Sequence, residues 1–413
     1  MRHHRTETPR ESAADRRPPR ATRPLGLAVP GRGHVTRDSI LDLQRTAGND
    51  VARQLLRGAP AARTTSGIGP APTVQRAPYG LDRPPSQGAF VSDAVRLRTT
   101  QSRLSLRDFA RALKKSIAVE LRAAGVPPVT WNIGPGSGPN GSFESSSWTL
   151  TVNTSAFSDR TPPPTTLGQL TEPEVTEVVG TLYHEARHAD QDVLIIRNLL
   201  SHGQRVAQVA AATGMPLKVV NAVKAATYPA ALDPELVGQA ERMFAVMYGP
   251  HKQFLEFLIK HGSAFVGLDD FAGGATPGTT APHVATFAAW QAGALRLHLQ
   301  QLAALKQPTP VEAALRARLR AVDAVLTLFL TQWNALTTNP ASVDIDDVRD
   351  LAVRVRDEVL ATYKSLEGEM DAFRLDDAVK AAFATALAAA KAKAAAAAAT
   401  SKPKPKPKPK GKP

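Results

Sequence analysis

The stretch TLYHEARHADQ, residues 181–191, decides how this sequence is interpreted. His184 and His188 stand four positions apart, with Glu185 directly after the first histidine. On an α-helix, residues four apart lie on the same face, so both imidazoles can bind one ion. Glu185 would then reach a water on that ion, which is where a general base for peptide hydrolysis is needed. The pattern predicts a zinc site with two histidine ligands and Glu185 as the catalytic base.

The residues around this stretch predict a long helix. Thr171 followed by Glu174 forms a capping box, Pro173 is tolerated in the first turn, and Gly203 marks the end. Apolar residues between 175 and 196 follow helical spacing. The polar residues at 190–192 stand where they can orient an imidazole. The alternative is a surface helix that carries its histidines and glutamate as solvated side chains.

A catalytic zinc usually takes three protein ligands, so a third donor must be found. The extended pattern H-E-x-x-H-x-x-G-x-x-H is excluded, because Gln191 and Leu194 occupy the positions of its glycine and last histidine. A second helix, opening at Asp233 and Pro234, offers glutamates instead.

Glu241 is the predicted third ligand on that second helix. Its neighbours at helical spacing include Val237, Phe244 and Tyr248, which places the carboxylate on an apolar face. A buried carboxylate needs a cation or a hydrogen-bond network, so a structural ion pair is the alternative. Glu235, by contrast, is explained by the helix dipole alone.

Tyr248 and His251 are the candidates for stabilising a transition state. Both follow Glu241 near the helix end expected at residues 249–250, and either could donate a hydrogen bond to a developing oxyanion. The alternative is a packing tyrosine and a surface histidine.

A small β element is predicted before the zinc helix, which makes the fold class α+β and mostly α. Residues 129–133 and 148–152 both alternate in polarity, and the Gly/Pro/Ser-rich residues 134–147 would join them as a hairpin loop. A helix precedes them, capped by Ser105, with an apolar stripe to Leu121 and an end at Gly125.

This order of elements, with the motif, resembles the zincin or gluzincin group of zinc metallopeptidases over residues 86–275. The resemblance implies Zn²⁺ as cofactor, a protein or peptide substrate, and the roles of ligand, base, ligand and ligand for His184, Glu185, His188 and Glu241. It also implies that residues 148–152 form an edge strand that pairs with extended substrate.

Residues 39–56, SILDLQRTAGNDVARQLL, and the later VQR at 74–76 carry a second resemblance. They are similar to the LQRxAGNxxVxxLL leader of proteins associated with bacterial extracellular contractile injection systems, with Ala52 in place of the valine. The resemblance implies an effector or toxin that docks on a particle component. Physically, residues 38–57 form a short amphipathic helix too small to fold alone; a fragment with no docking role is the alternative. The leader residues are Leu43, Gln44, Arg45, Ala47, Gly48, Asn49, Val51, Leu55 and Leu56.

The net charge of +14 lies in the two ends of the chain. Residues 1–80 hold 14 Lys and Arg against 6 Asp and Glu, and residues 391–413 hold 8 Lys and no acid. We expect a disordered basic segment over 1–85 and an extended Lys-Pro tail over 400–413. Such tails bind anionic surfaces weakly and with strong salt dependence.

Between the zinc domain and the tail, residues 276–399 are predicted to form an antiparallel helical bundle, with helices at 284–306, 311–336, 343–366 and 371–399.

The chain has no cysteine, which excludes disulfides and thiolate metal sites. No Sec signal and no transmembrane segment are visible, so we expect a protein that is cytoplasmic in the producing cell and then loaded into a particle.

The sequence thus predicts a zinc metallopeptidase-like effector or accessory protein of a contractile injection system. Two other hypotheses remain open. One is a non-enzymatic adaptor with a structural or degenerate metal site, and the other is a nucleic-acid or membrane-surface binder that acts through its basic tails.

Overall fold

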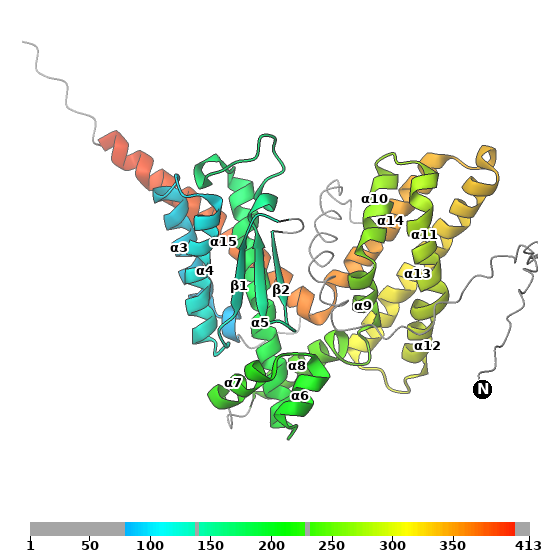
Figure 1. The fold of residues 1–413 in the computed structure, drawn as a ribbon, viewed down its shortest axis with the longest axis horizontal. Helices are drawn as coiled ribbons and strands as arrows, with labels where there is room; N and C mark the ends of the chain where they lie inside the picture. Colours follow the sequence, from blue (N-terminus) through cyan, green and yellow to red (C-terminus); the bar gives the residue numbers. More distant parts are fainter. Residues whose placement is uncertain (1–78, 137–139, 228–231, 401–413) are drawn as a thin grey trace, which may run out of the picture. The chain divides into compact units, whose positions relative to one another are not determined.

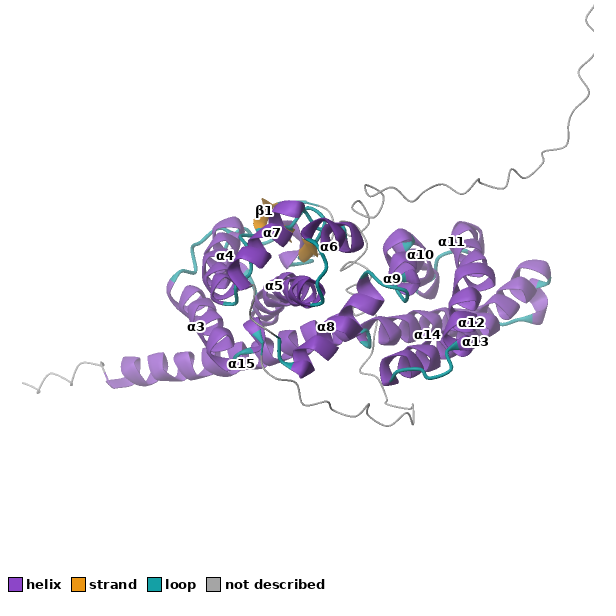
Figure 2. Ribbon diagram, turned by 90° about the horizontal axis from the view of Figure 1, so that it is seen from below, coloured by secondary structure: helices purple, strands orange, loops and turns teal. Residues whose placement is uncertain are grey.

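The computed structural model describes residues 79–136, 140–227 and 232–400, and these are mostly helical with one small sheet (Figures 1 and 2). Of the segment predicted as disordered over 1–85, residues 1–78, including the leader at 38–57, lie outside the described residues, as do residues 401–413 of the tail predicted at 400–413. Residues 79–85 are described, and they hold a 3-10 turn at Gly80–Asp82 and the start of a helix at Pro84. The strands are β1 (Thr130–Gly134), β2 (Gly141–Glu144) and β3 (Thr149–Asn153). The helices are α3 (Pro84–Thr100), α4 (Leu106–Ala123), α5 (Glu172–Ser201), α6 (Val206–Thr213), α7 (Leu217–Thr227), α8 (Pro234–Met247), α9 (Gln253–Lys260), α10 (Gly262–Ala272), α11 (Pro277–Trp290), α12 (Arg296–Ala304), α13 (Pro310–Thr338), α14 (Ile345–Lys364) and α15 (Glu367–Thr400).

Helix α5, which carries the motif, forms as its capping signals predict. The Thr171 hydroxyl accepts from the Glu174 amide, and the Glu174 carboxylate accepts from the Thr171 amide at 2.6 Å. Gly203, with φ of +80°, follows the helix end. The helix runs through the core, and its apolar residues from Val175 to Leu200 are buried. The alternative of a surface helix is therefore wrong.

The sheet differs from the predicted hairpin. The strand order is β1-β3-β2, with β1 parallel to β3 and β2 antiparallel to β3. The missing strand, β2, lies inside the Gly/Ser-rich stretch that was read as a loop, because Gly and Ser carry little strand propensity. The predicted edge strand at 148–152 is therefore the central strand, and β2 is an edge that packs beside α5.

The first hydrophobic core is built around α5 and the sheet. It includes residues of α3, α4 and α8, and it also includes Leu375, Val379, Phe383 and Leu387 of α15. Gly180 allows α15 to lie close along α5, because a Cβ at that position would overlap Asp376 and Lys380. The prediction that residues 276–399 form one separate bundle is corrected, since α15 belongs to the core of the motif helix.

A second core is formed by residues from Val246 to Leu366, on helices α8 to α14 and the turn that follows them. The helices expected at 311–336 and 343–366 correspond to α13 and α14, while the one expected at 284–306 is divided into α11 and α12 by a π-helical turn, η4 (Gln291–Leu295). Among the helices of the described residues, none combines the length and apolarity needed to cross a bilayer.

Candidate metal centre

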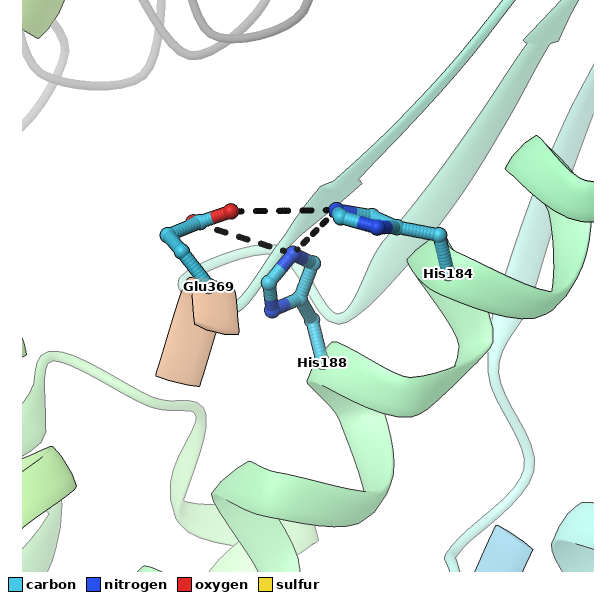
Figure 3. Close-up of side chains that lie close together, drawn as sticks. All are labelled: His184, His188 and Glu369. Atoms are coloured by element: carbon cyan, nitrogen blue, oxygen red, sulfur yellow. Dashed lines mark hydrogen bonds and ion pairs between the residues drawn. The ribbon is translucent and has the colours of Figure 1, made fainter. Parts of the chain in front are cut away.

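Two histidines from α5 and a glutamate from α15 converge on one point (Figure 3). One ligand atom from each of His184, His188 and Glu369 lies within 4.8 Å of the others. The two histidine Nε2 atoms are 3.1 Å apart, and the Glu369 carboxylate oxygens lie 3.7 Å and 3.8 Å from them. Two ligands at about 2.0–2.1 Å from a tetrahedral zinc are about 3.3 Å apart, so the spacing of the imidazoles suits a single ion.

A hydrogen bond to Gln191 determines which ring nitrogen of His188 carries the proton. The Gln191 side-chain nitrogen donates to the Gly368 carbonyl at 2.8 Å and to Asp371 at 3.0 Å, which turns the amide oxygen towards His188 Nδ1 at 3.0 Å. In the neutral imidazole that oxygen requires a proton on Nδ1, and the Nε2 lone pair is then available to a metal.

The two imidazoles differ in their tendency to hold a proton. Burial, followed by the nearby His188 and Lys380, holds the pKa of His184 well below its usual range. Burial also lowers the pKa of His188, but Glu369 and Glu185 outweigh it and the pKa lies above its ordinary value. His184 is therefore neutral at pH 7, as a metal ligand must be.

The surroundings of the Glu369 carboxylate are suited to a bound cation. Burial raises the pKa of this carboxyl, although His188 and a hydrogen bond from Tyr363 act in the opposite direction. Within the described residues, its buried Oε2 accepts no hydrogen bond. A carboxylate oxygen buried without a partner, facing two imidazole nitrogens, is stabilised by a shared ion.

Glu185 lies beside the edge of the sheet. It is 2% exposed, and its Oε2 accepts a hydrogen bond from the Phe143 amide of β2 at 2.9 Å. A Cβ on Gly141 would come within 3.0 Å of the Glu185 side chain, so the glycine allows β2 to approach α5. The structure thus brings Glu185, which lies between the two histidines in sequence, to a backbone donor of an edge strand.

A buried ionic network holds the start of α15 against α5. Asp371 accepts from Arg187 Nε at 2.8 Å, from Gln191 at 3.0 Å and from Arg374 at 3.1 Å. Arg187 also pairs with Asp190, and both are buried. Asp371 stands two residues after Glu369 and also accepts from Gln191, which is hydrogen-bonded to His188. It therefore links the positions of two candidate ligands, Glu369 and His188.

The predicted third ligand, Glu241, is not part of this centre and is corrected to Glu369. Its side chain is 58% exposed, and its Oε1 lies 4.0 Å from Nε2 of His202. Helix α8 turns Ala240 and Met243 into the core, so position 241 faces outwards. Its expected apolar face is only half-buried.

Tyr248 and His251 form hydrogen bonds with residues other than the three ligands. The Tyr248 hydroxyl lies 2.9 Å from Ser145 Oγ and donates to Asp192 at 2.8 Å. His251 Nε2 lies 3.0 Å from a carboxylate oxygen of Glu312 on α13. These contacts do not test their predicted role at the oxyanion, which stays a prediction.

Sequence reasoning missed Glu369 and Tyr363. The signal that could have found them is the stripe Leu375, Val379 and Phe383, which recurs every four residues and indicates that α15 enters a core. Glu369 precedes that stripe on the same helix, where a carboxylate becomes partly buried.

Comparisons with protein-family models, with curated proteins and with solved structures find no match for this chain. The interpretation of the centre therefore depends on its geometry and on the chemistry of its donor set. Two imidazole nitrogens and one carboxylate are a set that zinc accepts.

Proposed function

We propose that the chain is a zinc-dependent hydrolase that cleaves peptide bonds. The observation that supports this proposal is the convergence of His184, His188 and Glu369 with Glu185 on the same helix as the histidines. Two histidines and one glutamate form a ligand set of catalytic zinc sites, which leave one position open. Structural zinc sites usually have four protein ligands, whereas the described residues bring together three.

Zn²⁺ in this ligand set would supply Lewis acidity and lower the pKa of a water molecule. Glu185 is suited to hold the proton that is removed and to return it to the leaving amine. The Phe143 amide orients that carboxylate, while Gln191 and the Tyr363 hydroxyl orient His188 and Glu369.

The first experiment is the zinc content of the purified chain and of matched variants. We expect one zinc per wild-type chain, and loss of it in His184→Ala and Glu369→Gln, because each removes a donor. Glu241→Gln is the control and should keep its zinc, since that carboxylate is exposed. A wild type without zinc after purification in the absence of chelator would contradict the proposal.

A non-enzymatic adaptor with a structural metal site is the second candidate function. It is favoured by the burial of the ligand side chains, which are 5% to 14% exposed and leave little room for substrate in this conformation. Two results would support the adaptor. The zinc would resist removal by a chelator, and Glu185→Gln would not differ from the wild type in zinc content or in peptide hydrolysis.

We also propose that the protein is an effector or accessory protein loaded into a contractile injection particle through residues 38–57. The support is the LQRTAGN stretch at 43–49, which resembles the leaders of such proteins. Deletion of residues 38–57 should abolish co-sedimentation with the particle and leave the zinc content unchanged. Equal co-sedimentation of both forms would contradict this role.

A further inference from the structure

Lys364 is a half-buried cation near the metal centre. Its ammonium lies over the ring of Phe373, 5.1 Å from the ring centroid. Within the described residues, no carboxylate comes within ion-pair distance of it. Burial lowers the pKa of this lysine, while the carboxylates of Asp377 and Asp376 act against this shift from beyond ion-pair distance and Lys380 adds to it. An anion in direct contact would further reduce the cost of removing the ammonium from water.

Phe373 connects this lysine to the candidate ligands. Its ring packs edge-on against the His184 imidazole, with centroids 4.7 Å apart. Tyr363, which directly precedes Lys364, donates its hydrogen bond to Glu369. The Lys364 ammonium therefore lies within about 10 Å of the His184 ring. An extended peptide advances about 3.3–3.6 Å per residue, so this upper limit corresponds to at most about three residues of substrate.

We propose that Phe373 and Lys364 form a substrate subsite that recognises a carboxylate within about three residues of the bond to be cleaved. The inference rests on the proposed zinc-dependent activity and adds the class of its substrate. The Phe373 ring provides an apolar wall for the peptide, and the Lys364 ammonium provides the charge. The carboxylate belongs to an acidic side chain or to the C-terminus of the peptide.

The test measures binding of zinc-chelating probes, which needs no turnover. Straight-chain hydroxamates with two to six methylenes are compared in pairs, one ending in a carboxylate and one in its methyl ester. For the best length, the acid should bind at least tenfold more tightly than the ester, because only the acid can form a charge-assisted contact with the Lys364 ammonium. Lys364→Met should abolish the difference, and Lys364→Arg should retain it.

Lys114→Met is the matched control, since Lys114 also lies over an aromatic ring, that of Trp131, at 5.9 Å. It should bind both probes like the wild type. Equal binding of acid and ester at every length would overturn the subsite, as would failure of both probes to bind a zinc-loaded protein. A protein without zinc would instead contradict the proposed function. Peptides with Glu or Gln at each position, and with free or amidated C-termini, then identify the source of the carboxylate.

Discussion

At the scale of single residues, the orientation of one amide controls the chemistry of the centre. The side-chain nitrogen of Gln191 donates to two acceptors on α15, so its side-chain oxygen faces His188 Nδ1. Replacing Gln191 with Glu would keep the acceptor but would remove the donors that connect it to α15. The residues around the ligands thus determine which nitrogen faces the ion.

Glu185→Gln separates binding from catalysis. If Glu185 acts as the general base, the variant should keep its zinc and lose peptide hydrolysis by about 10²–10⁴-fold, because the amide cannot accept the proton. The measurement is turnover of a peptide that the wild type cleaves, with the zinc content determined in the same samples. Activity within a factor of a few of the wild type would assign the base to another residue.

Asp192 predicts a dependence of stability on pH. Burial raises its pKa to about 6 from an ordinary value of 3.8, so the folded chain binds this proton more tightly than the unfolded chain. Its contribution is therefore favourable below about pH 4 and is lost as the pH rises towards 6. Asp192→Asn keeps an acceptor for the Tyr248 hydroxyl. It should remove the pH-dependent loss of unfolding free energy that is due to Asp192, which is about 3 kcal/mol at most.

The measurement for Asp192 is denaturant unfolding between pH 4 and 7 in the presence of a chelator, which prevents zinc binding from contributing to the slope. The free energy of unfolding of Asp192→Asn should fall less over this range than that of the wild type. Asp377→Asn, on the exposed side of α15, is the control and should follow the wild type. Parallel curves for all three proteins would contradict the assignment.

At the scale of elements, the first turn of α15 functions through its attachment to α5. Asp371→Asn would weaken the contact with Arg187 and leave that guanidinium buried with one carboxylate instead of two. We expect zinc affinity to fall about 10- to 100-fold, as for other partners of metal ligands. Competition with a chromogenic chelator measures it, and the ligand-field spectrum of the cobalt form reports whether the ligand geometry has changed.

The matched variant for Asp371 is Asp376→Asn, a second acidic residue of α15 that pairs with Lys380. It should lower zinc affinity less than Asp371→Asn does, because Asp376 hydrogen-bonds neither a ligand nor Gln191, and Lys380 acts on His184 only through its charge. If both variants lower affinity equally, the effect of Asp371 is general loss of helix packing rather than positioning.

Element boundaries show what local sequence can predict. The N-caps Thr171, Ser105 and Asp233 were all identified from sequence, because a cap is a hydrogen bond between residues two or three apart. The strand β2 was missed, since Gly141, Ser142 and Glu144 have little intrinsic preference for a strand. The parallel pairing of β1 with β3 was missed because two strands that follow one another in sequence favour a hairpin, and β2 occupies the other edge of β3.

At the scale of the whole molecule, the core of the motif helix is closed by α15, the last helix among the described residues. Leu375, Val379, Phe383 and Leu387 of α15 are buried in it. Burying four such side chains stabilises the fold by on the order of 10 kcal/mol, which is comparable to the whole stability of a domain. The motif region over 86–275 is therefore not expected to fold by itself.

Two truncations test this arrangement. A fragment ending at residue 275 should be insoluble or unable to bind zinc, because it lacks Glu369 and the apolar face of α15. Removal of residues 401–413 alone should leave zinc content and melting temperature unchanged, and it should reduce binding to anionic vesicles at low salt. A soluble 79–275 fragment that binds one zinc would show that the third ligand is not Glu369.

Helix α5, with His184, Glu185 and His188 on it, could be predicted from the sequence alone, because capping and helical spacing act within a few residues. The sequence also indicated the mostly helical character and the lack of cysteine. Glu369 could be identified as the third ligand candidate only from the tertiary structure, since it lies far along the chain and reaches α5 through the packing of α15. The tertiary structure also excluded Glu241, because the face that a helix buries depends on which neighbours it meets, and no local pattern contains that information.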